Sequence, residues 1–94
     1  DEDASRRLRK LEQERHAYQR QATEAEVLAR QAKRNLDLFK EQYESGQRQV
    51  MDVVGVYENY VDQRQSLIGL KYKAVITALE IAREQGLLAD GAKI

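Results

Sequence analysis

The stretch Glu44-Ser45-Gly46-Gln47 decides the fold, because it is the one credible turn in a 94-residue chain that contains no proline. On either side of it, apolar residues recur at helical spacing over a long segment. Glycine readily adopts the left-handed conformation that ends many helices, whereas proline would have interrupted the segments themselves. We therefore expect a single helical hairpin, with helices at 5–44 and 49–85, a turn at 45–48 and a tail at 86–94.

The first segment carries a heptad pattern that predicts a helix packed against one partner helix. Twelve positions follow one another at alternating steps of four and three residues, and eleven of them are apolar. Alanine occupies the centre of this pattern, so the two helix axes should approach closely there while burying little apolar area. Asp3 or Ser5 is expected to cap the helix. The twelve positions, called the first seam below, are Ala4, Leu8, Leu11, Arg15, Tyr18, Ala22, Ala25, Ala29, Ala32, Leu36, Phe39 and Tyr43.

The second segment differs, because it carries two neighbouring apolar stripes. The long stripe consists of Val54, Tyr57, Val61, Gln65, Ile68, Tyr72, Val75, Leu79 and Ala82. The short stripe consists of Val53, Tyr60, Leu67, Ala74, Ala78 and Ile81. Together they are wider than the surface that one partner helix covers, which indicates a piece of a larger helical assembly, either an oligomer or a longer chain. Gly86 is expected to stop this helix.

The composition favours no catalytic, metal-binding or cofactor-binding role. The chain has no cysteine and one histidine, His16, and no nucleotide-binding or metalloprotease motif occurs in it. Lysine plus arginine and aspartate plus glutamate both number 16, so the net charge of zero argues against binding to nucleic acid. The mean hydropathy is −0.77, and no apolar run is long enough to cross a bilayer. We expect a structural or interaction protein rather than an enzyme.

The sequence around the turn resembles a known family. Residues 36–54, LDLFKEQYESGQRQVMDVV, are similar to the second helical hairpin of the TolC-like outer-membrane efflux and secretion channels. The family pattern is an aromatic residue, two residues, glycine, any residue, arginine, a short polar residue, two apolar residues and aspartate. The resemblance covers about residues 30–88 and is closest to members paired with type I secretion or adhesin export. The matching residues are Tyr43, Gly46, Arg48, Val50, Met51 and Asp52.

The resemblance implies a segment of an α-helical tunnel in the periplasmic portion of a trimeric outer-membrane channel. The β-barrel that anchors such a trimer in the membrane would lie in parts missing from this chain. The turn at Gly46 would be the periplasmic tip, which in this family meets an adaptor protein that is itself joined to an inner-membrane transporter. Tip residues also hold the entrance closed. By this resemblance the tip, gate and adaptor contacts would be Tyr43, Gly46, Arg48, Val50 and Asp52.

Two positions depart from the family pattern, and two other interpretations stay open. Gln49 stands where the family often has serine or threonine and is a poorer helix cap, and Gly55 stands where some members have a second acidic residue. One alternative is the α-helical hairpin of the adaptor itself, although its usual Arg-Leu and Ser at the tip are absent. The other alternative is a free-standing coiled-coil oligomerisation module, which predicts one narrow seam on both helices.

Overall fold

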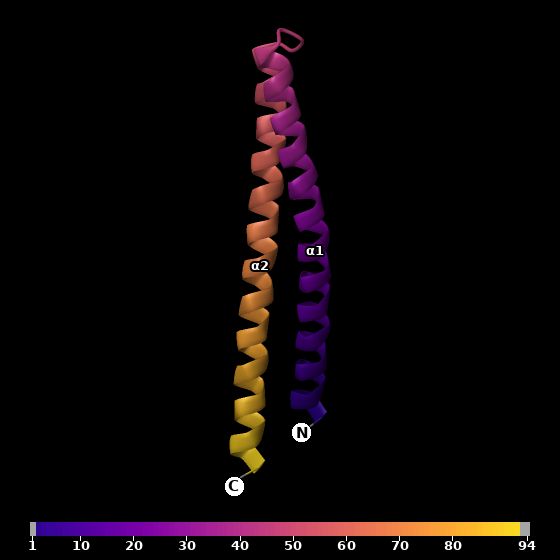
Figure 1. Cartoon of the computed structure of the whole chain (residues 1–94). Coiled ribbons are helices and arrows are strands. Elements are labelled where there is room, and N and C mark those ends of the chain that lie inside the picture. Colours follow the sequence, from indigo (N-terminus) through magenta and orange to yellow (C-terminus); the bar gives the residue numbers. More distant parts are fainter. Residues whose placement is uncertain (1, 93–94) are drawn as a thin grey trace. The chain divides into compact units, whose positions relative to one another are not determined.

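The computed structural model describes residues 2–92 and contains two long helices (Figure 1). Helix α1 spans Glu2–Glu44, helix α2 spans Val50–Ala92, and each has 43 residues. No strand occurs in this part of the chain. The turn between the helices covers residues 45–49. The all-α two-helix hairpin predicted from the heptad pattern and the glycine turn is confirmed.

The hairpin divides into two compact units, each of which contains part of both helices. The tip unit is the continuous segment Ala22–Gly69, with the turn at its end. The open-end unit combines residues 2–21 of α1 with residues 70–92 of α2. Within each unit the α1 segment lies beside the α2 segment and runs in the opposite direction (Figure 1).

The helix ends differ from the prediction mainly at two places, in addition to a start of α2 at Val50 instead of residue 49. Helix α1 begins at Glu2, so Asp3 and Ser5 lie inside its first turns rather than before it, and the acidic side chains of Glu2 and Asp3 stand at its positive end. Helix α2 continues through Gly86, so the predicted stop there is wrong, and the predicted tail is helical as far as Ala92. Residues 93–94 of that tail lie outside the described residues.

The physical reason for the longer α2 is the conformation of its glycines. A glycine ends a helix when it adopts positive φ, and among the described residues Gly46 alone does so, with φ of 83°. Gly86 keeps a helical conformation instead. Leu87, Leu88 and Ala89, which follow it, are strong helix formers that offset the weak helix preference of glycine.

The first seam is confirmed as the buried face of α1. Every described residue of α1 that is buried belongs to it, and Leu8, Leu11, Arg15, Tyr18 and Phe39 are half-buried. Tyr43, at the end of the helix, is exposed. The buried members are Ala4, Ala22, Ala25, Ala29, Ala32 and Leu36.

The buried face of α2 is narrower than the two predicted stripes. It follows alternating steps of three and four residues, like the first seam, and takes in the short stripe except for Ala78, which is exposed. Six of its members belong to neither predicted stripe: Val56, Gln63, Leu70, Thr77, Glu84 and Leu88. We call this face the second seam; it consists of Val53, Val56, Tyr60, Gln63, Leu67, Leu70, Ala74, Thr77, Ile81, Glu84 and Leu88.

The long stripe of α2, by contrast, faces away from α1. Of its nine residues only Val61 is half-buried, and the other eight are exposed. The expectation of an apolar surface that α1 leaves uncovered is therefore met by the long stripe alone.

The two units differ in how their seams are filled. In the tip unit, α1 contributes alanines opposite larger side chains of α2, whereas the open-end unit places the charged residues Arg15 and Glu84 in the seams.

Candidate functional site at the hairpin tip

The end of α1 is closed by a Schellman motif centred on Gly46. The amide of Gln47 donates to the carbonyl of Gln42 at 2.7 Å, and the amide of Gly46 donates to the carbonyl of Tyr43 at 3.0 Å. Both bonds satisfy carbonyl groups that a helix end would otherwise leave without a partner. The motif requires positive φ at Gly46, which a residue with a Cβ atom resists. The turn therefore has one defined backbone path.

The start of α2 is capped by Asp52. Its Oδ2 atom accepts a hydrogen bond from the backbone amide of Gln49 at 3.1 Å, and its own amide donates to the Gln49 carbonyl at 3.0 Å. This is the reciprocal half of a capping box, in which an acidic residue at the third helical position reaches back to the capping residue. Asp52 thus compensates for the weak capping side chain of Gln49, and its negative charge lies at the positive end of the helix dipole.

Arg48 is held against α1 by two contacts. Its guanidinium carbon lies 4.1 Å from the centroid of the Phe39 ring, and its Nε atom donates to Oε1 of Gln42 at 2.9 Å. The ring face attracts the cation, and the hydrogen bond fixes the direction of the guanidinium plane. Arg48 is therefore an ordered residue of the tip, although it belongs to the turn.

The remaining tip residues form an exposed apolar rim. Tyr43, on the last turn of α1, and Val50 and Met51, on the first turn of α2, leave 48%, 54% and 68% of their surfaces accessible. Large apolar side chains at these exposures indicate a contact surface when they stand together. All five predicted site residues thus lie at the tip, where Gly46 and Asp52 build the backbone and Tyr43 and Val50 are exposed.

Two residues of the tip were missed by the sequence reasoning. Phe39 was assigned to the first seam alone, and Gln42 was not assigned any role, yet both contact Arg48. Their spacing of three residues places them on one face of α1, next to each other, and this spacing was the available signal.

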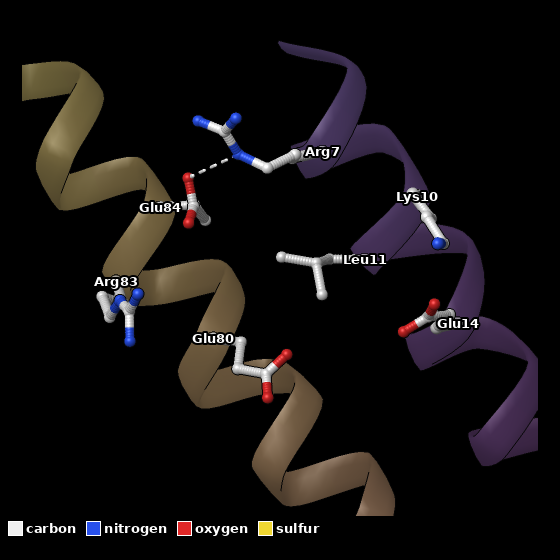
Figure 2. Close-up of a pocket in the computed structure, with 7 residues that line it drawn as sticks. All are labelled: Arg7, Lys10, Leu11, Glu14, Glu80, Arg83 and Glu84. Atoms are coloured by element: carbon white, nitrogen blue, oxygen red, sulfur yellow. Dashed lines mark ion pairs between the residues drawn. The ribbon is translucent and has the colours of Figure 1, made fainter. Parts of the chain in front are cut away.

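A hollow lies in the open-end unit, between the two helices (Figure 2). Its volume is about 360 Å³, and Leu11 points into it. Arg7 Nε reaches across to Oε2 of Glu84 at 3.8 Å. Three cationic and three acidic side chains balance each other around it, so the hollow selects no ligand charge. Its lining consists of Arg7, Lys10, Leu11, Glu14, Glu80, Arg83 and Glu84.

On the charged surface of the tip unit, the pKa of Lys33 is shifted from its ordinary value. Lys33 Nζ donates to Oδ1 of Asp37 at 2.9 Å, and this hydrogen bond together with the negative charge of Asp37 raises the pKa of Lys33 above its ordinary 10.5. Lys33 also lies 6.0 Å from the centroid of the Tyr60 ring. In the described part of the chain, no three histidine, cysteine or acidic residues gather as metal ligands do, and neither helix is apolar over enough length to span a membrane.

Comparison with known proteins gives no further guide to the site. No family model, curated protein or solved structure matches the chain.

Proposed function

We propose that this chain is a segment of the α-helical periplasmic tunnel of a trimeric outer-membrane channel for efflux or type I protein secretion. The tip turn would contact a periplasmic adaptor protein, which is in turn joined to an inner-membrane transporter. The observation that carries the proposal is the position of the motif that resembles the TolC-like channels. Tyr43, Gly46, Arg48, Val50 and Asp52 all lie where α1 and α2 meet, between two helices of 43 residues each.

Several features of the hairpin suit a tunnel wall. Proline-free helices of this length cover a long distance, because each residue adds about 1.5 Å. The alanines of the first seam let α1 approach α2 closely in the tip unit. The long stripe of α2 leaves an apolar surface for a neighbouring helix. A hairpin that stands between neighbours needs these properties, whereas a hairpin that works alone would bury its apolar residues on one face.

The tip has features that suit contact with a second protein. Its backbone is fixed by the Schellman motif and by the Asp52 cap, so an adaptor would meet a preformed surface. Tyr43, Val50 and Met51 supply exposed apolar area, and Arg48 supplies a planar group that binds carboxylates and carbonyls. An aromatic and aliphatic rim beside an arginine is a composition enriched at protein interfaces.

The test is to locate and probe the intact gene product that contains this chain. An antibody raised against residues 1–94 should detect the gene product in the outer-membrane fraction. The particle extracted from that fraction with detergent should contain three copies of the gene product. A photo-crosslinking amino acid in place of Val50 should capture a periplasmic adaptor in living cells. The same group in place of Gln31, which is exposed on α1 away from the tip, should not capture it.

Three results would contradict the proposal. The first is an antigen found in the cytoplasm, and the second is a particle that does not contain three copies. The third is equal capture of the adaptor at Val50 and at Gln31. An intact gene product in which lipoyl-like domains flank this chain would favour the adaptor hairpin instead.

A further inference from the structure

The exposed long stripe of α2 is symmetric about the bond between Arg64 and Gln65. Its apolar members, apart from Ala82, lie at equal distances in sequence on the two sides of that bond once Val50 is added as one more step at the start of the stripe. The matching pairs are Val61 with Ile68, Tyr57 with Tyr72, Val54 with Val75, and Val50 with Leu79. An apolar pattern that is the same in both directions along a helix is the pattern that an antiparallel copy of that helix matches.

The stripe is large enough for a stable contact. Apart from the half-buried Val61, its paired members leave between 37% and 66% of their surfaces accessible. Side chains of this size leave on the order of 100 Å² each at such exposure, and thus roughly 700 Å² together. Each partner of a standard protein interface buries about 800 Å². Scattered apolar residues on a monomer need no explanation, but a stripe of this area indicates a contact surface.

The charges of α2 reverse at the same centre. Residues 50–63 carry Asp52, Glu58 and Asp62 and no basic residue. Residues 64–79 carry Arg64, Lys71 and Lys73 and no acidic residue. All six side chains are exposed. In an antiparallel pair the acidic segment of each copy therefore faces the basic segment of the other, whereas a parallel pair would bring like charges together.

We propose that a second copy of this chain docks on the long stripe, with the two α2 helices antiparallel and centred at Arg64–Gln65. The two-fold axis then places Val54 of one copy opposite Val75 of the other. It also places Tyr57 opposite Tyr72, a pairing that suits offset or edge-to-face contact of the rings. Glu58 stands opposite Lys71, and because the interface is symmetric this ion pair occurs twice.

The dimer goes beyond the tunnel function and does not rest on it. It follows from the exposed face of α2 and from the order of its charges, and it concerns the 94-residue chain itself. The chain can form the dimer whether or not the intact gene product is a channel, so failure of the dimer and failure of the tunnel proposal are separate outcomes.

The first experiment measures the association of the free chain and exchanges its charges. Sedimentation equilibrium at micromolar concentration should give a mass about twice 10.9 kDa. Glu58→Lys and Lys71→Glu, each alone, should weaken the dimer about tenfold, because two symmetric ion pairs become repulsive. The double variant Glu58→Lys/Lys71→Glu should restore the affinity. Circular dichroism should show the same helix content in all three variants, since both residues are exposed.

The second experiment determines the direction of the pairing with introduced cysteines, which will be the sole thiols because the chain has none. Gln65→Cys alone should form a disulfide-linked dimer, since it lies next to the two-fold axis. Val50→Cys alone should not, because the two copies of residue 50 lie about 40 Å apart in the antiparallel pair. Val50→Cys/Leu79→Cys should form the dimer again.

Each of the following results would overturn the proposal. One is a monomer throughout the micromolar range, which would assign the stripe to a different partner. Another is a trimer. A third is efficient cross-linking of Val50→Cys alone, which indicates parallel helices. The last is a double charge exchange that binds no better than the two single variants.

Discussion

The guanidinium of Arg48 lies over the ring of Phe39, with its central carbon 4.1 Å from the ring centroid, and this contact joins the turn to the last turns of α1. Gln42 adds a hydrogen bond to Nε of the same side chain at 2.9 Å. Phe39, Gln42 and Arg48 thus form one small cluster. Gln42 follows Phe39 by three positions in sequence, and Arg48 follows Gln42 by six. The direction in which Arg48 presents its remaining donors is set by this cluster, not by the turn alone.

Replacing Phe39 with leucine should release Arg48. Leucine keeps an apolar side chain at this seam position but has no ring face to attract the cation, so the contact of about 0.5–1 kcal/mol is lost. The Arg48 Nε–H resonance in nuclear magnetic resonance spectra should move toward the random-coil position and exchange faster with water. Phe39→Tyr keeps the ring and should leave the resonance in place. An unchanged Arg48 resonance in Phe39→Leu would mean that Gln42 alone holds the side chain.

Replacing Gly46 with alanine should destabilise the hairpin by about 1–2 kcal/mol, because a Cβ atom opposes the positive φ on which the Schellman motif depends. Gly55→Ala is the matched control within the tip unit. Gly55 lies inside α2, and an added Cβ would meet nothing within 4 Å beyond its chain neighbours and the adjacent backbone of its own helix, so alanine should stabilise the helix by about 0.5–1 kcal/mol. Urea unfolding followed by circular dichroism measures both changes. A change in the free energy of unfolding with the same sign in both variants would contradict the assigned turn.

Replacing Ala29 with leucine should destabilise the tip unit by about 1–3 kcal/mol. Ala29 is buried in the first seam, and the added carbon atoms have no space there unless α1 and α2 move apart. Gln31→Leu places the same side chain two residues away on the exposed side of α1 and should be nearly neutral. The melting temperatures of the two variants compare the positions directly. A similar decrease in both would show that the seam does not govern the packing.

The first seam could be predicted from the sequence because its spacing is regular and its residues are small. Alanine, leucine and phenylalanine at alternating steps of four and three have one face in common, and one partner helix covers it. The second seam could not be predicted in the same way. It contains polar residues such as Thr77 and Glu84, whereas the more apolar long stripe lies on the exposed side. Hydrophobicity alone therefore predicted a wide apolar face on α2, but it did not indicate which part of that face packs against α1.

At the tip, backbone features could be predicted and side-chain contacts could not. Gly46 is the one position in the turn that tolerates positive φ, so the turn itself was evident. Arg48 has a long side chain that can reach many partners, so the spacing that places Phe39 and Gln42 on one face of α1 does not by itself select them as its partners across the turn. The end of α2 was missed because a glycine is compatible both with a helix stop and with a helix interior.

Replacing Asp37 with asparagine should lower the pKa of Lys33 toward its ordinary value of 10.5, because the hydrogen bond and the negative charge of Asp37 raise it. The raised pKa means that this pair stabilises the folded chain fully below pH 10.5 and loses that contribution as the pH rises through the higher folded value. Nuclear magnetic resonance titration of the Lys33 side chain measures the shift. Asp62→Asn is the control, since Asp62 lies on α2 and is not among the groups that shift Lys33. If the pKa of Lys33 is unchanged in Asp37→Asn, the proposed ion pair between Lys33 and Asp37 is excluded.

Replacing Tyr43 with phenylalanine and Arg48 with serine together should raise the single-channel conductance of the proposed channel in planar bilayers. The Nε atom of Arg48 is bonded to Gln42 within its own hairpin, which leaves the two terminal guanidinium nitrogens for acceptors on a neighbouring hairpin. The exposed Tyr43 hydroxyl can donate across the same gap. Each such contact contributes about 0–1 kcal/mol, but three-fold symmetry repeats it around the entrance.

Trimer stability should hardly change in this double variant, because Tyr43 and Arg48 are both exposed and neither is among the buried residues of the first seam. Arg64→Ser is the matched control, since Arg64 is exposed on α2 at a distance from the turn, and it should leave the conductance unchanged. An equal rise in Arg64→Ser would reflect a general loss of positive charge rather than an opened entrance. Unchanged conductance in the double variant would show that Tyr43 and Arg48 are not part of a gate. The proposed place of the hairpin in a tunnel wall would then still be decided by the fractionation and cross-linking experiments.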